Sequence, residues 1–173
     1  MAVIAAKCPH IKVTVVDISV KQIAAWNSSA LPIYEPGLDI MLQSHLASAQ
    51  LSFSQHLEEG IKQAEVIVIA VGTPSGEDGS ADLSHVLAVA DELGEHLEQR
   101  CVVVNKSTVP VGTAERVAQR INSQLLKRNR RFTVTLASDP EFRKEGSAIA
   151  DFMRPDRVIV GCDEPHGHEV LRR

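Results

Sequence analysis

The sequence predicts an α/β protein built on a doubly wound parallel sheet. Short apolar runs rich in Val and Ile recur along the chain, helical patterns separate them, and turn residues follow the runs. Apolar strands that alternate with helices indicate a parallel sheet covered by helices on both faces. Ligands of such sheets bind beyond the carboxyl ends of the strands, where these turns lie.

The elements follow from these patterns in chain order. After a helix-like start come a strand at residues 11–17, helices at 20–27 and 36–47, a strand at 51–54, a helix at 56–62 and a buried strand at 66–71. Apolar residues at positions 83, 86, 87, 90, 93 and 97 then define one face of an amphipathic helix. A strand at 101–105, a helix at 113–126 and strands at 132–136 and 158–160 complete the pattern, which we expect to form one domain over residues 1–173.

Composition and charge exclude several classes of protein. Apolar residues make up 44% and charged residues 23%, as in soluble globular proteins. The net charge of -4 gives no attraction to nucleic acid or to an anionic membrane, and no apolar run is long enough to span a bilayer. The three cysteines, Cys8, Cys101 and Cys162, are far apart and form no CxxC pair, which fits a reducing cytoplasm.

Asp17 closes the first predicted strand. In a dinucleotide-binding fold, an acid at the end of the second strand accepts hydrogen bonds from the adenosine ribose of NAD and repels the extra phosphate of NADP. The alternative is an acid stabilised by the dipole of the following helix, and both interpretations stay open. A glycine-rich turn should precede such an acid by about 20 residues, and no such turn occurs before Asp17.

Two further turns follow predicted strands. In VGTP (71–74), glycine allows a ligand to approach the backbone and proline sets the exit direction, although an ordinary turn has the same composition. The segment STVP (107–110) leads into a helix, and its hydroxyls and free N–H groups suit a polar or anionic ligand. The hydroxyls of Ser107, Thr108 or Thr113 are also suited to cap that helix.

The segment PEFRKEG (140–146) holds two acids four residues apart. On a helical turn Glu141 and Glu145 would share a face, and like charges held close raise the pKa of a carboxyl group. Such a group suits general acid–base catalysis. A solvated charged turn is the alternative interpretation.

Two other charged clusters are interpreted as ordinary surface. The acids and histidines of residues 163–168 look like metal ligands, but a segment with Pro and Gly is typical of a solvated loop. The basic run 127–131 looks like a nucleic-acid contact, but basic residues also favour a helix C-terminus. We therefore predict no metal site and no nucleic-acid partner.

Taken together, these motifs resemble the UDP-glucose 6-dehydrogenase family. The matching stretches are VTVVD (13–17), LPIYEPGL (31–38), VGTP (71–74), ADL (81–83), KSTVPVGT (106–113), PEF (140–142), KEG (144–146) and RPDRVIVG (154–161). The resemblance implies a Rossmann-like fold, NAD as cofactor and UDP-glucose as substrate. Members of the family oxidise the C6 alcohol of UDP-glucose to a carboxylate with two NAD+, through a cysteine thioester.

The resemblance also implies roles for individual residues. Asp17 would hold the adenosine ribose, and the rest of the cofactor would contact Val71, Gly72, Thr73, Pro74, Ser75, Ser107, Thr108, Val109 and Glu145. Thr108 would help to position a catalytic water, and Glu141 would be the acid/base residue of the hydrolytic phase. The sugar nucleotide would contact Glu141, Phe142, Arg143, Lys144 and Glu145.

This sequence departs from the family pattern at two positions inside the matched region. The family usually has Asn where Asp139 stands and Leu where Arg143 stands. A negative charge at 139 would disfavour a diphosphate if it faced one. Arg143 would either offset that charge or point to solvent, and both interpretations stay open.

The resemblance places further parts of the family pattern outside residues 1–173. A first strand and glycine-rich loop would precede Met1, and the catalytic cysteine and second nucleotide-binding domain would follow Arg173. We therefore expect a partial NAD-binding domain, inactive and poorly stable alone, from a protein that is a homo-oligomer when full length. The alternatives are a GDP-mannose or UDP-N-acetylmannosamine dehydrogenase, or a non-catalytic NAD-binding module.

Overall fold

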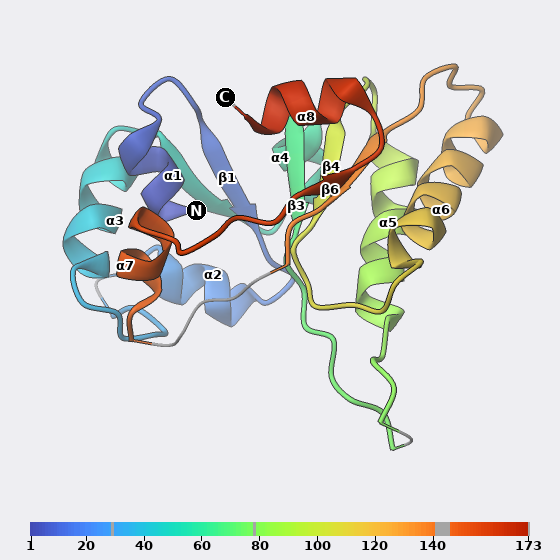
Figure 1. Ribbon diagram of the computed structural model, residues 1–173. Helices are drawn as coiled ribbons and strands as arrows, with labels where there is room; N and C mark the ends of the chain where they lie inside the picture. The colour runs from blue at the N-terminus through green and yellow to red at the C-terminus, as the bar shows by residue number, and fades with distance from the viewer. Residues whose placement is uncertain (29, 78, 141–145, 173) are drawn as a thin grey trace. The chain divides into compact units, whose positions relative to one another are not determined.

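The computed structural model describes residues 1–28, 30–77, 79–140 and 146–172 (Figure 1). Its internal contacts divide the chain into two compact units. The first contains residues 1–60 and the described part of 142–157, and the second contains the described residues of 61–141 and 158–173. The predicted α/β class is confirmed, since parallel strands alternate with helices in both units.

The first unit holds a two-stranded parallel sheet. Strand β1 (Val13–Val16) pairs with β2 (Leu51–Ser54), with Val13 opposite Leu51. Helices α1 (Ala2–Lys7), α2 (Val20–Trp26), α3 (Leu38–Ala47) and α7 (Ala148–Met153) belong to this unit. Helix α4 (Leu57–Ile61) leads out of it.

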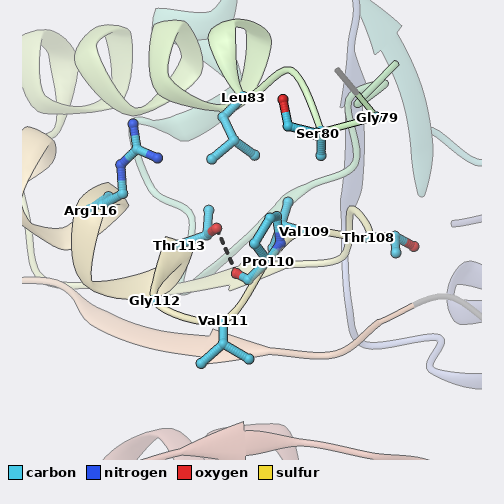
Figure 2. Close-up of a pocket in the computed structure, with 11 residues that line it drawn as sticks. Gly79, Ser80, Leu83, Thr108, Val109, Pro110, Val111, Gly112, Thr113 and Arg116 are labelled. Atoms are coloured by element: carbon cyan, nitrogen blue, oxygen red, sulfur yellow. Dashed lines mark hydrogen bonds between the residues drawn. The ribbon is translucent and has the colours of Figure 1, made fainter. Parts of the chain in front are cut away.

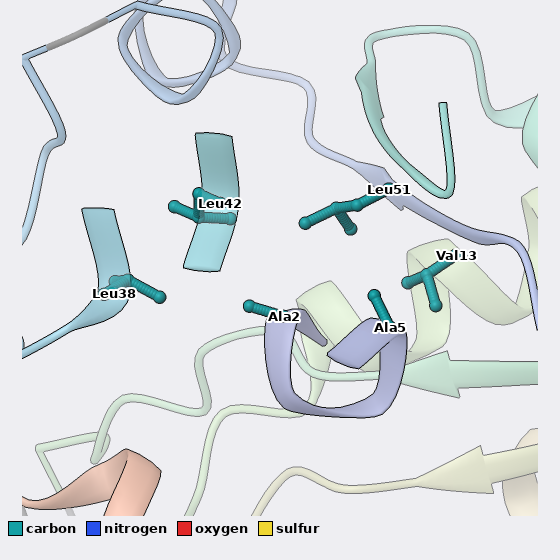
Figure 3. Close-up of a cluster of buried hydrophobic side chains, with 6 residues drawn as sticks. All are labelled: Ala2, Ala5, Val13, Leu38, Leu42 and Leu51. Carbon is teal, nitrogen blue, oxygen red and sulfur yellow. The ribbon is translucent and has the colours of Figure 1, made fainter. Parts of the chain in front are cut away.

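The core of the first unit lies among α1, α3 and the two strands. Its buried side chains are Ala2, Ala5, Val13, Leu38, Leu42 and Leu51 (Figure 3). Beside this cluster, the rings of Trp26 and Phe53 stack with their centroids 5.4 Å apart. The helix-like start predicted from sequence is therefore a helix that contributes to the core.

The second unit holds a four-stranded sheet in the order β3-β4-β5-β6. Strands β3 (Val66–Ile69), β4 (Val102–Asn105) and β5 (Thr135–Ser138) are parallel, and β6 (Gly161–Cys162) is antiparallel to β5. Helices α5 (Ser84–His96), α6 (Thr113–Lys127) and α8 (Pro165–Leu171) complete the unit.

The central strand β4 is buried along its whole length. Val102 and Val104 form an apolar cluster with Ala137 and with side chains of α8. Because side chains alternate across a strand, Val103 and Asn105 face the opposite side of the sheet. Such burial on both faces matches the continuous apolar run in the sequence.

Helices α5 and α6 pack tightly on each other. A Cβ atom on Gly94 would lie 2.6 Å from the Cβ atom of Gln124 and 2.8 Å from the main-chain oxygen of Ile121, so only glycine allows this approach. Arg128 follows α6, and its guanidinium donates to the main-chain oxygens of Gly94 and Leu97 at the end of α5. The basic run therefore begins at a helix end, as predicted.

Several predicted elements are wrong in place or type. Residues 158–160 are not a strand, and the strand of that region is the two-residue β6. The segment 163–168, expected to be a loop, lies largely in α8, where Pro165 occupies the first turn that its fixed φ favours. Strand β5 begins later than expected because pairing with β4 places Thr135 opposite Val102.

Both sheets have an edge that no strand of the described residues covers. Strand β1 pairs with β2 along one side, and β3 pairs with β4 along one side. Among the described residues, no helix combines the length and apolar character required to cross a bilayer.

Candidate cofactor site at the strand ends of the second unit

The segments singled out in the second unit follow strands β3, β4 and β5. Because these strands are parallel, their carboxyl ends meet at one edge of the sheet. VGTP (71–74) follows β3, STVP (107–110) follows β4, and Asp139 follows β5. The fold therefore brings together loops that are far apart in the sequence.

Two hydroxyls join the first two loops. Ser107 Oγ donates to the main-chain oxygen of Val71 over 2.7 Å, and Thr73 Oγ1 donates to that of Thr108 over 2.9 Å. Both hydroxyls were predicted to contact the cofactor. In this structure their protons go to the neighbouring loop, so each oxygen is available to a ligand as an acceptor.

The turn after β3 is followed by backbone contacts between residues 74–75 and 81–82. Ser75 pairs with Ala81 in an antiparallel bridge, and the Asp82 N–H donates to the Pro74 oxygen. A Cβ atom on Gly72 would meet no atom within 4 Å, so the fold itself does not require glycine there. This openness is compatible with the close ligand approach predicted for Gly72.

The start of α6 has no side-chain cap. Its N-cap is Gly112, whose φ of 87° favours glycine, and no side-chain oxygen accepts from the first turn. Thr113 Oγ1 instead donates to the Pro110 oxygen, the dashed bond of Figure 2. Capping of this helix by Ser107, Thr108 or Thr113 is therefore wrong. The N–H groups at the helix start suit an anionic or polar ligand.

A pocket of about 710 Å³ opens beside this helix start (Figure 2). Thr108 to Thr113 line one side, and the other is lined by Gly79, Ser80, Ala81 and Leu83. Arg116 reaches the pocket from the first turns of α6 and has no ion-pair partner within the described residues. The N–H groups, the exposed Thr108 and this cation fit a polar, negatively charged molecule such as a dinucleotide.

Asp17 lies in the first unit, directly after β1. Its Oδ1 accepts from the Ser19 N–H over 2.7 Å, and Ser19 is itself the N-cap of α2, where it accepts from the Gln22 N–H. Asp17 therefore accepts a hydrogen bond beside the start of α2, and its two interpretations, a ribose contact and stabilisation by the helix dipole, both stay open. One carboxylate oxygen suffices for that contact, so the second is compatible with a ribose hydroxyl. Residues 141–145, which carry Glu141 and Glu145, lie outside the described part of the chain.

Sequence reasoning did not select three residues that the structure places at this edge. His85 Nδ1 lies 3.2 Å from the Gly72 oxygen, Arg116 lines the pocket, and Lys106 pairs with Asp139. The position of Arg116 four residues after Gly112 could have indicated it, because that spacing keeps a side chain near the helix start. No local pattern indicated His85.

One carboxyl group near this edge has a perturbed pKa. The backbone N–H of Ser84 donates to Asp82, and this hydrogen bond, followed by the Ser84 side chain, lowers the Asp82 pKa. His85 contributes in the same direction. Asp82 is therefore a charged anchor at the start of α5.

A model of the UDP-glucose/GDP-mannose dehydrogenase family, NAD binding domain, matches residues 1–173. The chain belongs to this family. NAD is accordingly the cofactor of the domain, in agreement with the chemistry of the strand edge. The Rossmann-like character of the fold is confirmed by a ternary complex of GDP-mannose dehydrogenase from Pseudomonas aeruginosa, with a TM-score of 0.89 and 29% identity over 99% of this chain and 39% of that one.

Similar members of the family are dehydrogenases of UDP-glucose. A UDP-glucose 6-dehydrogenase of Pseudomonas aeruginosa is 58% identical over 153 residues, or 88% of this chain and 34% of that protein. One from Rhizobium meliloti is 45% identical over 156 residues, or 90% of this chain and 35% of that protein. A UDP-glucose dehydrogenase structure from Pyrobaculum islandicum has a TM-score of 0.82 and 36% identity, covering 92% of this chain and 37% of that one. The chain thus spans about a third of the length of these relatives.

Proposed function

We propose that the protein containing this chain is a UDP-glucose 6-dehydrogenase. The observation that carries the proposal is the 58% identity over 153 residues to a UDP-glucose 6-dehydrogenase. The reaction converts the C6 alcohol of UDP-glucose into a carboxylate. Four electrons leave the sugar as two hydrides, one for each of two NAD+, and water supplies the second carboxylate oxygen.

In this reaction the described residues bind and orient the cofactor. Asp17 accepts from the adenosine ribose, and its charge disfavours the phosphate of NADP. The loops that follow β3 and β4 line the dinucleotide through Val71, Gly72, Thr73, Pro74, Ser75, Ser107, Thr108 and Val109. Bound NAD+ supplies the hydride acceptor. The hydrogen bonds from Ser107 and Thr73 hold the two loops at a constant separation, which supports this arrangement.

The remaining roles concern the reacting sugar. The exposed Thr108 hydroxyl helps to orient the water that hydrolyses the acyl intermediate. Glu141 transfers the proton of that step, and the segment 141–145 contacts the sugar nucleotide, with Glu145 also near NAD. We further propose that the protein is cytoplasmic, in keeping with three free cysteines and no disulfide among the described residues. A homo-oligomer is proposed from the family resemblance alone.

The test is turnover by the full-length purified protein. UDP-glucose and NAD+ should give two NADH per sugar, and mass spectrometry should identify UDP-glucuronate. GDP-mannose and UDP-N-acetylmannosamine serve as matched alternative substrates. Higher kcat/KM with either of them would reassign the substrate. Binding of NADH without turnover of any of the three would indicate a non-catalytic NAD-binding module instead.

A further inference from the structure

Lys106 and Asp139 form an ion pair between the loops that follow β4 and β5. The Lys106 ammonium lies 2.9 Å from Asp139 Oδ2 and 3.3 Å from the Asp139 main-chain oxygen. The Lys106 side chain is only 10% exposed and that of Asp139 is 29% exposed. A charge so withdrawn from water needs an opposite charge and hydrogen bonds to compensate its lost hydration. The position of the Lys106 side chain therefore depends on that of the Asp139 side chain, and the reverse.

The backbones of both residues are anchored to the sheet. The Lys106 N–H donates to the Ile69 oxygen over 2.8 Å, and the Asp139 N–H donates to the Asn105 oxygen over 3.0 Å. Each residue thus extends the ladder by one position past the end of its strand. The ion pair consequently connects two fixed points of the sheet edge.

The residues directly after Lys106 connect its loop to the turn that follows β3. Ser107 donates to the Val71 oxygen, and the Thr108 oxygen accepts from Thr73. A continuous set of contacts therefore runs from Asp139 through Lys106 to the turn after β3. Because Lys106 directly precedes Ser107 and Thr108 in the chain, a substitution of Asp139 that displaces Lys106 would also displace these two residues.

We propose that Asp139, acting through Lys106, is a positioning residue that sets the loop from Ser107 to Val109 for NAD binding and dehydrogenation. This inference rests on the proposed function, because that loop is the one assigned to the cofactor and the catalytic water. In this geometry the Asp139 carboxylate faces Lys106 and is neutralised there. Misplacement of a reacting group by about 1 Å costs on the order of 100-fold in rate, so small shifts of this loop are measurable.

The experiment replaces Asp139 in the full-length protein. Asp139→Leu removes the acceptor oxygens and should lower kcat/KM for NAD+ by about 10- to 100-fold. Asp139→Asn keeps an oxygen acceptor in nearly the same place and should restore most of the loss. Lys106→Met should resemble Asp139→Leu, and the double variant should be no worse than the more impaired single variant, because the two residues act as one unit.

A second ion pair in the same unit provides the control. Arg120 Nη2 lies 2.5 Å from Asp91 Oδ2 and joins α6 to α5. Asp91→Leu should lower Tm and leave the KM for NAD+ unchanged. If Asp139→Leu gives this same result, the pair only stabilises the fold and the inference is overturned.

Titration with NADH, followed by fluorescence, measures the same effect without a sugar substrate. Asp139→Leu should raise the Kd for NADH by about tenfold or more if the cofactor loop is displaced. An unchanged Kd together with unchanged kcat/KM would contradict the inference and leave the proposed function intact. A wild-type protein that binds NADH but does not oxidise UDP-glucose would instead contradict the proposed function, and the Kd comparison would still test the role of Asp139.

Discussion

The Ser107 hydroxyl donates a 2.7 Å hydrogen bond to the main-chain oxygen of Val71, a residue 36 positions earlier in the chain. Ser107 is the second residue after β4, and Val71 is the second after β3. The bond therefore fixes the separation of two loops assigned to the same cofactor. Ser107 was predicted to contact the cofactor, and in this structure its hydroxyl proton is already donated to Val71.

Ser107→Ala should lower both stability and cofactor affinity. Loss of one partly buried hydrogen bond costs about 1 kcal/mol of the free energy of unfolding. The KM for NAD+ should rise as the loops separate. Thermal unfolding and steady-state kinetics measure the two effects. Ser48→Ala, which removes an exposed hydroxyl bond at the end of α3, is the control and should leave the KM unchanged. An unchanged KM for NAD+ in Ser107→Ala would show that the hydrogen bond from Ser107 to Val71 has no role in cofactor binding.

Asp17 should make the full-length enzyme prefer NAD+ over NADP+. Asp17→Asn retains an oxygen that can accept from the Ser19 N–H but removes the charge. The kcat/KM for NADP+ should therefore rise by about tenfold or more, because a like-charge contact with the extra phosphate disappears. Kinetics with both cofactors measure the change. Preference of the unchanged enzyme for NADP+ would refute the ribose role.

Glu141→Gln should reduce turnover by roughly 100-fold or more, the usual size of a general acid–base contribution. Glutamine keeps the size of the side chain and removes its ability to transfer a proton. Glu115→Gln, at an exposed position in the first turn of α6, is the matched control and should leave kcat unchanged. Wild-type kcat in Glu141→Gln would exclude Glu141 from the chemical step.

Gly94→Ala should destabilise the second unit by about 1–3 kcal/mol, since the new methyl group would overlap Gln124 and the Ile121 oxygen. Urea unfolding followed by circular dichroism measures the loss. The same substitution at Gly72 meets no atom within 4 Å and should change stability far less. Equal effects of the two variants would contradict the close packing of α5 against α6.

Cys101 should resist alkylation in the folded protein. Burial raises the pKa of its thiol from 9.0 to about 11, so the reactive thiolate is rare at mildly alkaline pH. As pH rises, the Cys101 thiol of the unfolded chain loses its proton before that of the folded protein. The contribution of this thiol to the free energy of unfolding is therefore fully present below pH 9.0 and is lost as the pH rises through about 11. Mass spectrometry after maleimide treatment should find Cys8 and Cys162 modified before Cys101. Equal labelling of all three would contradict this burial.

Much of the secondary structure was predictable because its signals are local. The apolar periodicity of residues 83–97 predicted α5 almost to its ends, and the apolar run at 66–71 predicted β3. The ordered series of motifs also indicated the family, which the match over residues 1–173 confirms. Strand β6 was missed because a two-residue strand has no period, and α8 because it is a seven-residue helix that contains Pro165 and Gly167, which are loop signals in sequence.

The sequence by itself determined the alternation of strands and helices, the family and the loops that follow the strands. Only the tertiary structure decided which partners the loop side chains take. Ser107 bonds to Val71, Lys106 pairs with Asp139, and Arg128 caps α5 across the helix pair. These partners are about 30 or more positions apart. The contacts of Ser107 and Lys106 exist only after the strands align in register, and that of Arg128 only after α6 packs on α5. Local propensity depends on neighbouring residues, whereas these contacts depend on the spacing of parallel strands and on the packing of two helices, which no short segment encodes.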